Sequence, residues 1–123
     1  MSLEYKFNNS NSTNSEGEKP EEKQVTEYYQ EPGRNRNLTF VQIDGSRQFF
    51  NYAYLAACSY SPSDASITLV FSTHTVKISG YKLAALFDAI EKQALKQIVA
   101  LDKRYASDDG DAPQVTEILI VDN

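Results

Sequence analysis

The segment Ile67–Tyr105 constrains the fold more than any other, because a strand pattern in it changes register and then gives way to a helical pattern. Apolar residues alternate on odd positions in Ser66–Phe71 and on even positions in Val76–Ser79. Successive side chains of a strand point to opposite faces, so one continuous strand cannot direct both sets toward the same core. A turn or a β-bulge within Ser72–Thr75 would reset the register. We favour the turn and predict a hairpin of residues 66–71 and 76–79.

A helical pattern follows Ser79 and Gly80. At 100° per residue, a set of apolar and aromatic positions falls within an arc of about 80°. These positions are Leu83, Phe87, Ile90, Ala94, Ile98, Leu101 and Tyr105. Such a stripe packs against a sheet, and the loop-like composition of residues 107–113 ends it. The pattern therefore predicts one long amphipathic helix over residues 83–105.

Three other segments have strand patterns. Leu38–Ile43 alternates apolar residues on both faces and precedes Asp44-Gly45, a strong hairpin-turn signal. Phe49–Tyr60 is ambiguous, because its aromatic residues favour a strand whereas the alanine-rich part, Ala53–Cys58, also suits a helical turn. We favour the extended form. Val115–Val121 is apolar on both alternating faces, which is typical of a central strand.

The composition divides the chain into a tail, residues 1–37, and one domain, residues 38–123. We expect the tail to be disordered, because it offers too little apolar surface to offset the entropy of ordering. Within the tail, Val25–Tyr29 either forms a transient helix or docks onto the domain. The domain is large enough for one core. We expect an α+β fold, with a mostly antiparallel sheet of four or five strands and the long helix packed on one face.

The charge balance narrows the class of partner. The net charge is −5, and residues 38–123 carry seven basic and ten acidic side chains. This balance argues against a nucleic-acid partner and against an anionic membrane surface. The sequence shows no signal-like apolar N-terminal region and no run of about 18 apolar residues. We therefore expect a cytoplasmic protein without a membrane partner.

Residues with reactive chemistry are isolated in the sequence. His74 is the only histidine, and with no carboxylate nearby we expect it to lie exposed and unpaired at the hairpin turn. Cys58, the only cysteine, has no basic neighbour that would activate it, which indicates a structural thiol. Asp108, Asp109 and Asp111 lack the spacing of a calcium loop. The sequence therefore predicts no catalytic residue, no metal and no cofactor.

Two sets of side chains suit contact with a partner. Leu95 and Val99 lie one turn apart on the predicted helix, away from its main stripe. Tyr52, Tyr54 and Tyr60 share one face if their segment is a strand, and tyrosine is enriched at interfaces. The same row could instead form the core under the helix. The polar side of the predicted helix, which we interpret as a solvated face, carries Lys82, Lys92, Lys96 and Lys103.

These features favour a non-catalytic protein-interaction or assembly module, which could be a homo-oligomer. The tail would then be a linker, or a tether that orders on binding. The alternative is a small-ligand-binding domain or minor enzyme that uses the tyrosines and the histidine around a pocket beside the helix. The candidate ligand or partner surface consists of Tyr52, Tyr54, Tyr60, His74, Leu95 and Val99.

Overall fold

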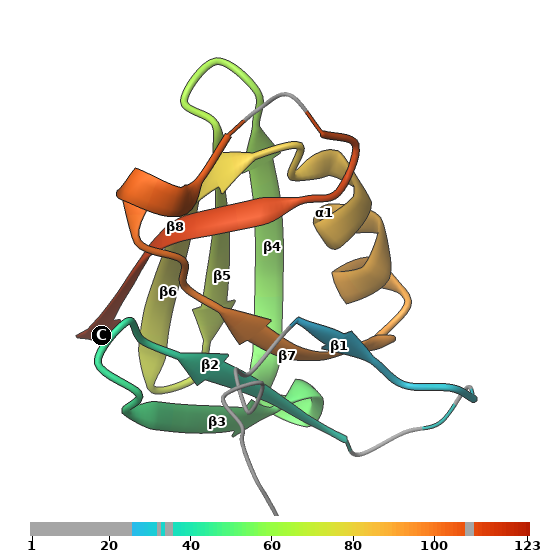
Figure 1. The fold of residues 1–123 in the computed structure, drawn as a ribbon. Coiled ribbons are helices and arrows are strands. Elements are labelled where there is room, and N and C mark those ends of the chain that lie inside the picture. Colours follow the sequence, from blue (N-terminus) through green and yellow to red (C-terminus); the bar gives the residue numbers. More distant parts are fainter. Residues whose placement is uncertain (1–25, 32, 34–35, 108–109) are drawn as a thin grey trace, which may run out of the picture.

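Two four-stranded sheets and one α-helix make up the described part of the chain, residues 26–31, 33, 36–107 and 110–123 of the computed structural model (Figure 1). The first sheet has the order β1 (Glu27–Tyr28), β7 (Leu95–Val99), β2 (Asn37–Val41), β3 (Arg47–Asn51). The second has the order β4 (Leu55–Ser61), β5 (Ser66–Phe71), β6 (His74–Tyr81), β8 (Gln114–Asp122). The helix is α1 (Ala84–Glu91), and 3₁₀ turns occupy Tyr52–Tyr54 and Lys103–Tyr105.

The core lies between the two sheets. Figure 1 shows β4, β5 and β6 running across the direction of β2, β3 and β7. Phe40 of β2 and Phe50 of β3 meet Phe71 of β5, with ring centroids 6.5 and 4.5 Å apart. These rings are buried, and so are aliphatic side chains from both sheets. The expectation of a mostly sheet protein with a helix is confirmed, but the expectation of one sheet is wrong.

The second sheet arises because Phe49–Tyr60 is not one strand. β3 ends at Asn51, whose side-chain oxygen accepts a hydrogen bond of 2.8 Å from the Ala53 N–H. This bond caps the 3₁₀ turn Tyr52–Tyr54, after which the chain continues as β4. Asparagine side chains stabilise such turns because they compete with strand hydrogen bonding. Both forms weighed from the sequence are therefore present, a strand at each end and a helical turn between them.

The prediction of one long helix over residues 83–105 is also wrong. α1 covers eight residues and buries Leu86, Ala89 and Ile90. Its end carries the two hydrogen bonds of a Schellman motif, from Gln93 N to Ile90 O and from Ala94 N to Ala89 O, at 2.9 and 2.8 Å. Gln93 takes the left-handed conformation, with φ of 56°. The chain then reverses and forms β7, so Leu95 and Val99 belong to a strand.

The two predicted hairpins are present. β5 pairs with β6 in antiparallel register, with Leu69 opposite Val76, and the turn at Ser72 and Thr73 resets the register as expected. β2 pairs with β3 around the Asp44-Gly45 turn, where Gly45 has φ of 90°. A positive φ of this size favours glycine.

β8 is an edge strand and not the predicted central strand. It pairs with β6 along one side only. On its other side, Ala100 forms an isolated parallel bridge with Val115, and the side-chain amide of Gln42 donates to Ile118 O at 3.1 Å. The strand is apolar on both faces, yet its outward-facing Leu119 and Val121 are about half exposed.

The N-terminal part of the described chain docks onto the first sheet. β1 pairs with β7 in antiparallel register, and Tyr29 N donates to Ala94 O at 2.7 Å. The Tyr29 hydroxyl donates to Asn37 O at 2.7 Å, and the guanidinium of Arg36 lies 4.3 Å from the centre of its ring. Of the two alternatives for Val25–Tyr29, docking therefore holds for residues 26–29. The predicted disordered tail covered residues 1–37, of which residues 1–25, 32, 34 and 35 lie outside the described residues.

We predict that Gly80→Ala is severely destabilising. A Cβ at this position, next to the bulge between β6 and β8, would lie 1.9 Å from the backbone oxygen of Gln114. Two backbones must separate to relieve that overlap, and we expect a loss of about 3 kcal/mol in the free energy of unfolding, or failure to fold. The measurement is urea denaturation followed by circular dichroism.

Gly110→Ala is the matched control. A Cβ there has no neighbour within 4 Å, so we expect stability within about 0.5 kcal/mol of the wild type. Equal effects of the two substitutions would contradict the close approach of β6 and β8 at Gly80.

Candidate functional site

The six predicted surface residues do not form one surface. Tyr52 and Leu95 are buried, with 2% and 0% of their surface exposed. The Tyr52 hydroxyl donates a hydrogen bond of 2.6 Å to the Leu95 carbonyl oxygen. Their prediction as a partner surface is wrong because the 3₁₀ turn directs Tyr52 between the sheets, and because Leu95 belongs to an inner strand.

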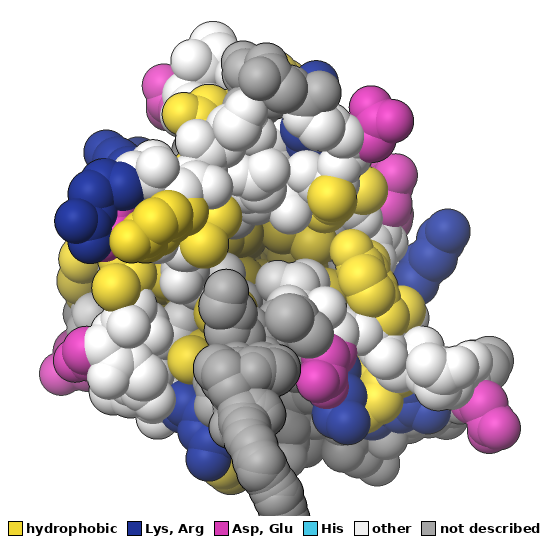
Figure 2. All heavy atoms as spheres, in the orientation of Figure 1, with side chains coloured by type: hydrophobic (Ala, Val, Ile, Leu, Met, Phe, Trp, Pro, Cys, Tyr) yellow, Lys and Arg dark blue, Asp and Glu magenta, His cyan; other side chains and the backbone are white. Residues whose placement is uncertain are grey.

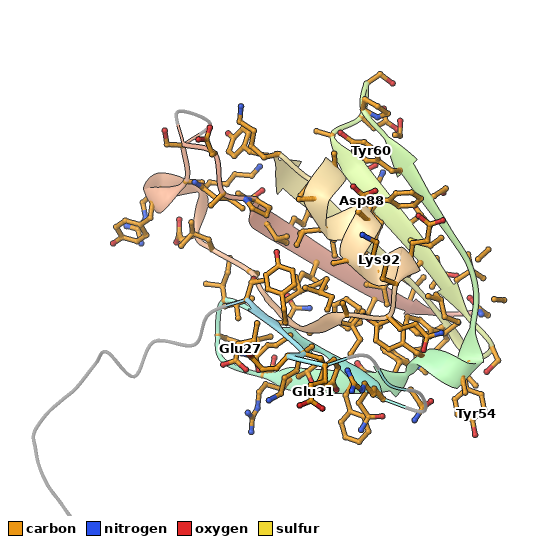
Figure 3. The ribbon with its side chains drawn as sticks, turned by 90° about the vertical axis from the view of Figure 1, so that its right-hand side faces the viewer. Glu27, Glu31, Tyr54, Tyr60, Asp88 and Lys92 are labelled. Atoms are coloured by element: carbon orange, nitrogen blue, oxygen red, sulfur yellow. The ribbon has the colours of Figure 1, made fainter. Side chains whose placement is uncertain are left out.

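The other tyrosines separate from each other. Tyr54 ends the 3₁₀ turn and is 61% exposed, far from α1 in Figure 3. Tyr60 of β4 is partly buried and stacks on Phe87 of α1, with centroids 6.0 Å apart. The expected tyrosine row is therefore broken by the turn, and only its two outer members, Tyr52 and Tyr60, lie beside the helix.

Val99 lines a hollow of about 590 Å³ to which none of the other five predicted residues contributes. This hollow lies between the β2–β3 connection and the segment after β7, and Figure 2 shows hydrophobic side chains on that side of the molecule. Ile43 and Tyr105 stand at its rim and are more than half exposed. No ionisable side chain other than the Tyr105 phenol lines it, so it offers no acid–base chemistry.

His74 is paired and partly buried, contrary to the expectation of an exposed and unpaired residue. Its Nε2 lies 2.9 Å from Asp122 Oδ1, its Nδ1 lies 2.7 Å from the Thr73 hydroxyl, and its ring lies 5.1 Å from that of Phe50. The carboxylate comes from the far end of the chain, where β8 pairs with β6. The two residues are 48 positions apart in the sequence, and they meet because of the pairing of β8 with β6.

The contacts around His74 describe a clamp on the end of β8. Asn123 N donates to Thr73 O, its side-chain amide donates to Phe71 O at 2.8 Å, and its amide oxygen accepts from the Thr75 hydroxyl at 2.6 Å. A hydroxyl, an imidazole and a carboxylate also occur in nucleophilic triads, but such sites bury the carboxylate. The Asp122 side chain is 89% exposed. The geometry therefore favours a structural role.

A cavity of about 280 Å³ lies between β4 and α1. β4 contributes its first four residues, α1 and the turn after it contribute the facing wall, and Tyr52 closes the inner end. The lining residues are Tyr52, Leu55, Ala56, Ala57, Cys58, Phe87, Ile90, Glu91 and Gln93. Figure 3 looks onto this side, with Tyr60 on β4 opposite α1, which carries Asp88 and is followed by Lys92. We call the cavity, with the free edge of β4 beside it, the α1–β4 groove.

The backbone of β4 is available at the groove. β4 is the edge strand of its sheet, so alternate N–H and C=O groups point away from β5. Between Leu55 and Ala57 the register shifts, which leaves Ala56 as an extra residue without a partner in β5. Bulges of this kind re-aim backbone and are common beside functional sites. Ala56 and Ala57 are exposed and small, so their own side chains cover little of the edge.

Two of the ionisable groups in the groove are neutral at physiological pH. Burial raises the pKa of the Cys58 thiol to about 11, so the thiol is neutral at physiological pH and is a poor nucleophile. Burial also raises the pKa of Tyr52, which donates to Leu95 as a neutral phenol. Glu91, on the outer rim, is the only carboxylate in the lining. The groove can bind apolar groups and backbone, but it lacks an acid–base pair.

The remaining expectations concern charged residues. The four lysines do not share a helix face: Lys82 precedes α1, Lys92 caps its end, Lys96 lies in β7 and Lys103 in a 3₁₀ turn. Asp108 and Asp109 of the predicted acidic loop lie outside the described residues. In the described ranges, no three His, Cys, Asp or Glu side chains are grouped so that they could hold a metal ion.

No protein-family model, curated protein or solved structure matches this chain. Function must therefore be inferred from its own residues. For the described segments, no helix combines the length and the hydropathy needed to cross a membrane. The sequence contains one signal for the groove that the sequence analysis missed. This signal is the absence of charged side chains along the strand Leu55–Ser61.

We predict that Tyr52→Phe lowers the free energy of unfolding by about 1 kcal/mol, because it removes the buried hydrogen bond to Leu95 O. Tyr54→Phe is the control, since the Tyr54 side chain is largely exposed and its substitution should change stability by less than about 0.5 kcal/mol. Urea denaturation at pH 7 measures both. Equal losses would show that the Tyr52 hydroxyl contributes nothing specific.

We also predict a loss of stability at alkaline pH. Cys58 and Tyr52 keep their protons in the fold to higher pH than their ordinary pKa values of 9.0 and 10.0. Above pH 9 the unfolded chain therefore binds fewer protons than the native chain, so the free energy of unfolding decreases as pH rises toward 11. The double variant Cys58→Ala/Tyr52→Phe should show a flatter decrease between pH 9 and 11. Parallel curves would contradict the burial of these two groups.

Proposed function

We propose that this protein is a non-catalytic interaction module that binds an extended segment of a partner protein by strand addition to β4. The observation that carries the proposal is the α1–β4 groove, where an uncharged sheet edge runs beside a helix and a cavity with both apolar and polar walls. In this mode of recognition, main-chain hydrogen bonds along the edge provide affinity, and pockets for alternate side chains provide specificity.

The comparison of the four sheet edges supports this assignment. β1 has two residues, one of them Glu27, and β3 begins with the exposed Arg47. β8 carries Glu117 and Asp122, and contacts from Ala100 and Gln42 cover part of its edge. Charges, shortness and coverage are the usual protection of edges against pairing with another chain. β4 is seven residues long and carries no charge, and it is protected only by its bulge and by α1, which lies beside its first four residues.

The size of the groove favours a peptide over a small molecule. Sites for drug-sized ligands usually enclose about 300–1,000 Å³, and the cavity beside β4, at about 280 Å³, is smaller and opens to solvent. It suits one or two apolar side chains of an extended chain. Buried Tyr52 forms part of the wall of the groove and Tyr60 stacks on Phe87 beside it, whereas His74 belongs to the clamp on β8. The tyrosines and the histidine thus do not line a common pocket.

The test is selection of a displayed library of random ten-residue peptides on the full-length protein. We expect enrichment of peptides with alternating apolar residues, and binding measured by fluorescence polarisation. Ala56→Trp should raise the dissociation constant about tenfold or more, a loss of about 1.4 kcal/mol, because the new ring fills the groove from an exposed position. Hydrogen exchange of β4 amides should slow when peptide is bound.

Ser59→Trp is the matched control. Ser59 lies on the same strand and is exposed, but it does not line the cavity. It should leave the dissociation constant within about twofold of the wild type, a difference below 0.5 kcal/mol. The proposal is wrong if no peptide is enriched, or if the enriched peptides bind the Ala56→Trp and Ser59→Trp variants equally well. Circular dichroism confirms that both variants are folded.

A further inference from the structure

The charge in the α1–β4 groove lies on the side of the helix. β4 carries no charged side chain. Asp88 and Glu91 belong to α1 and Lys92 follows it, and all three residues are exposed. Of these three, Glu91 is the one that lines the cavity. A ligand in the cavity therefore meets a carboxylate at its wall.

The surroundings of Glu91 favour a cation. Glu91 forms no ion pair with another described residue. It is the last residue of α1, where the helix dipole places partial negative charge, and the last turn of α1 contains no basic residue. A bound segment that covers this carboxylate removes water from it, which is unfavourable unless a cation replaces the water. The end of α1 therefore favours a positive side chain in the ligand over an apolar or acidic one.

We propose that the α1–β4 groove selects an extended partner segment in which a lysine or arginine follows an apolar residue by two positions. The apolar side chain occupies the cavity against Phe87, and the basic side chain pairs with Glu91. This inference rests on the function proposed above and adds the chemistry of the partner segment. The net charge of −5 supports it, because a negatively charged protein attracts basic segments before contact is made.

The spacing of two positions follows from the geometry of the helix and of an added strand. Phe87 and Glu91 are four residues apart on α1, so their side chains lie on the same face, about 6 Å apart. Tyr60 of β4 stacks on Phe87, so the side chains of an added strand on the same face as Tyr60 also point toward α1. Alternate side chains of such a strand are about 6.7 Å apart. An apolar and a basic side chain two positions apart therefore match Phe87 and Glu91.

The order of the two residues follows from the direction of α1. Leu83, which precedes α1, lines a hollow of about 230 Å³ together with Tyr60 and Pro62 at the end of β4. Glu91, which ends α1, lines the cavity beside the first four residues of β4. α1 therefore runs antiparallel to β4 (Figure 1). Antiparallel strand pairing is slightly more stable than parallel pairing, so a segment added to β4 runs in the direction of α1 and passes Phe87 before Glu91. The apolar residue thus precedes the basic one.

The experiment uses the library peptides enriched on the full-length protein, with binding measured by fluorescence polarisation. We expect these peptides to share an apolar residue followed two positions later by lysine or arginine. Glu91→Gln should weaken their binding about fivefold, because it removes the charge and keeps the size of the side chain. Glu117→Gln is the matched control, since it removes an exposed carboxylate of β8 that does not line the cavity. It should change the dissociation constant less than about twofold.

A change in the peptide tests the same contact without altering the protein. A peptide with methionine in place of its basic residue should bind the wild type about fivefold more weakly than the parent peptide. The same replacement should have little effect on binding to the Glu91→Gln variant, because the effects of two residues in contact are not additive. Higher salt should weaken binding of the parent peptide more than binding of the methionine peptide.

The outcomes separate this inference from the proposed function. If the enriched peptides lack the basic residue, or carry it before the apolar one, the proposed partner segment is wrong. It is also wrong if Glu91→Gln and Glu117→Gln have equal effects on binding. In each of these cases, weaker binding to the Ala56→Trp variant than to the Ser59→Trp variant would preserve the proposed function. If no peptide is enriched, both the proposed function and this inference are wrong.

Discussion

The buried hydrogen bond between the Tyr52 hydroxyl and the Leu95 carbonyl oxygen connects every part of the fold that matters for the groove. Tyr52 stands where the chain leaves the first sheet, and Leu95 begins the strand that follows α1. The bond therefore fixes the corner before β4 relative to the strand after the helix. Because β4 and α1 each attach to one side of this contact, their separation, and with it the width of the groove, depends on it.

The groove lies between β4 and α1. α1 packs beside the first part of β4 and leaves the cavity between the helix and the strand (Figure 3). A helix offers side chains and no main-chain partners for a strand edge. Phe87 and Ile90 pack toward the core, while the outward backbone groups of β4 gain no partner from α1. Main-chain groups of β4 and a cavity with both apolar and polar walls thus lie at one place.

The hairpins could be predicted from the sequence, because the change of parity between Leu69 and Val76 and the Asp44-Gly45 turn are local signals. The end of α1 could not. In most Schellman motifs glycine occupies the left-handed position, which makes the helix end recognisable in the sequence. In this protein Gln93 occupies that position. Ile98 also falls on the helical arc by coincidence, since β7 buries it beside β2. Over a short stretch, the helical and the strand periods can place the same apolar residues on one face, so the spacing of apolar residues does not distinguish a helix from a strand.

The candidate site was less accessible to sequence reasoning than the fold, for a related reason. The His74–Asp122 pair and the cavity between Leu55 and Ile90 join residues that are distant in sequence, and only the order of the strands in each sheet brings them together. The sequence does show that β4 has no charged side chain. A segment without charge is easily interpreted as an ordinary buried strand. An edge strand without charge is costly, because it invites pairing with other chains.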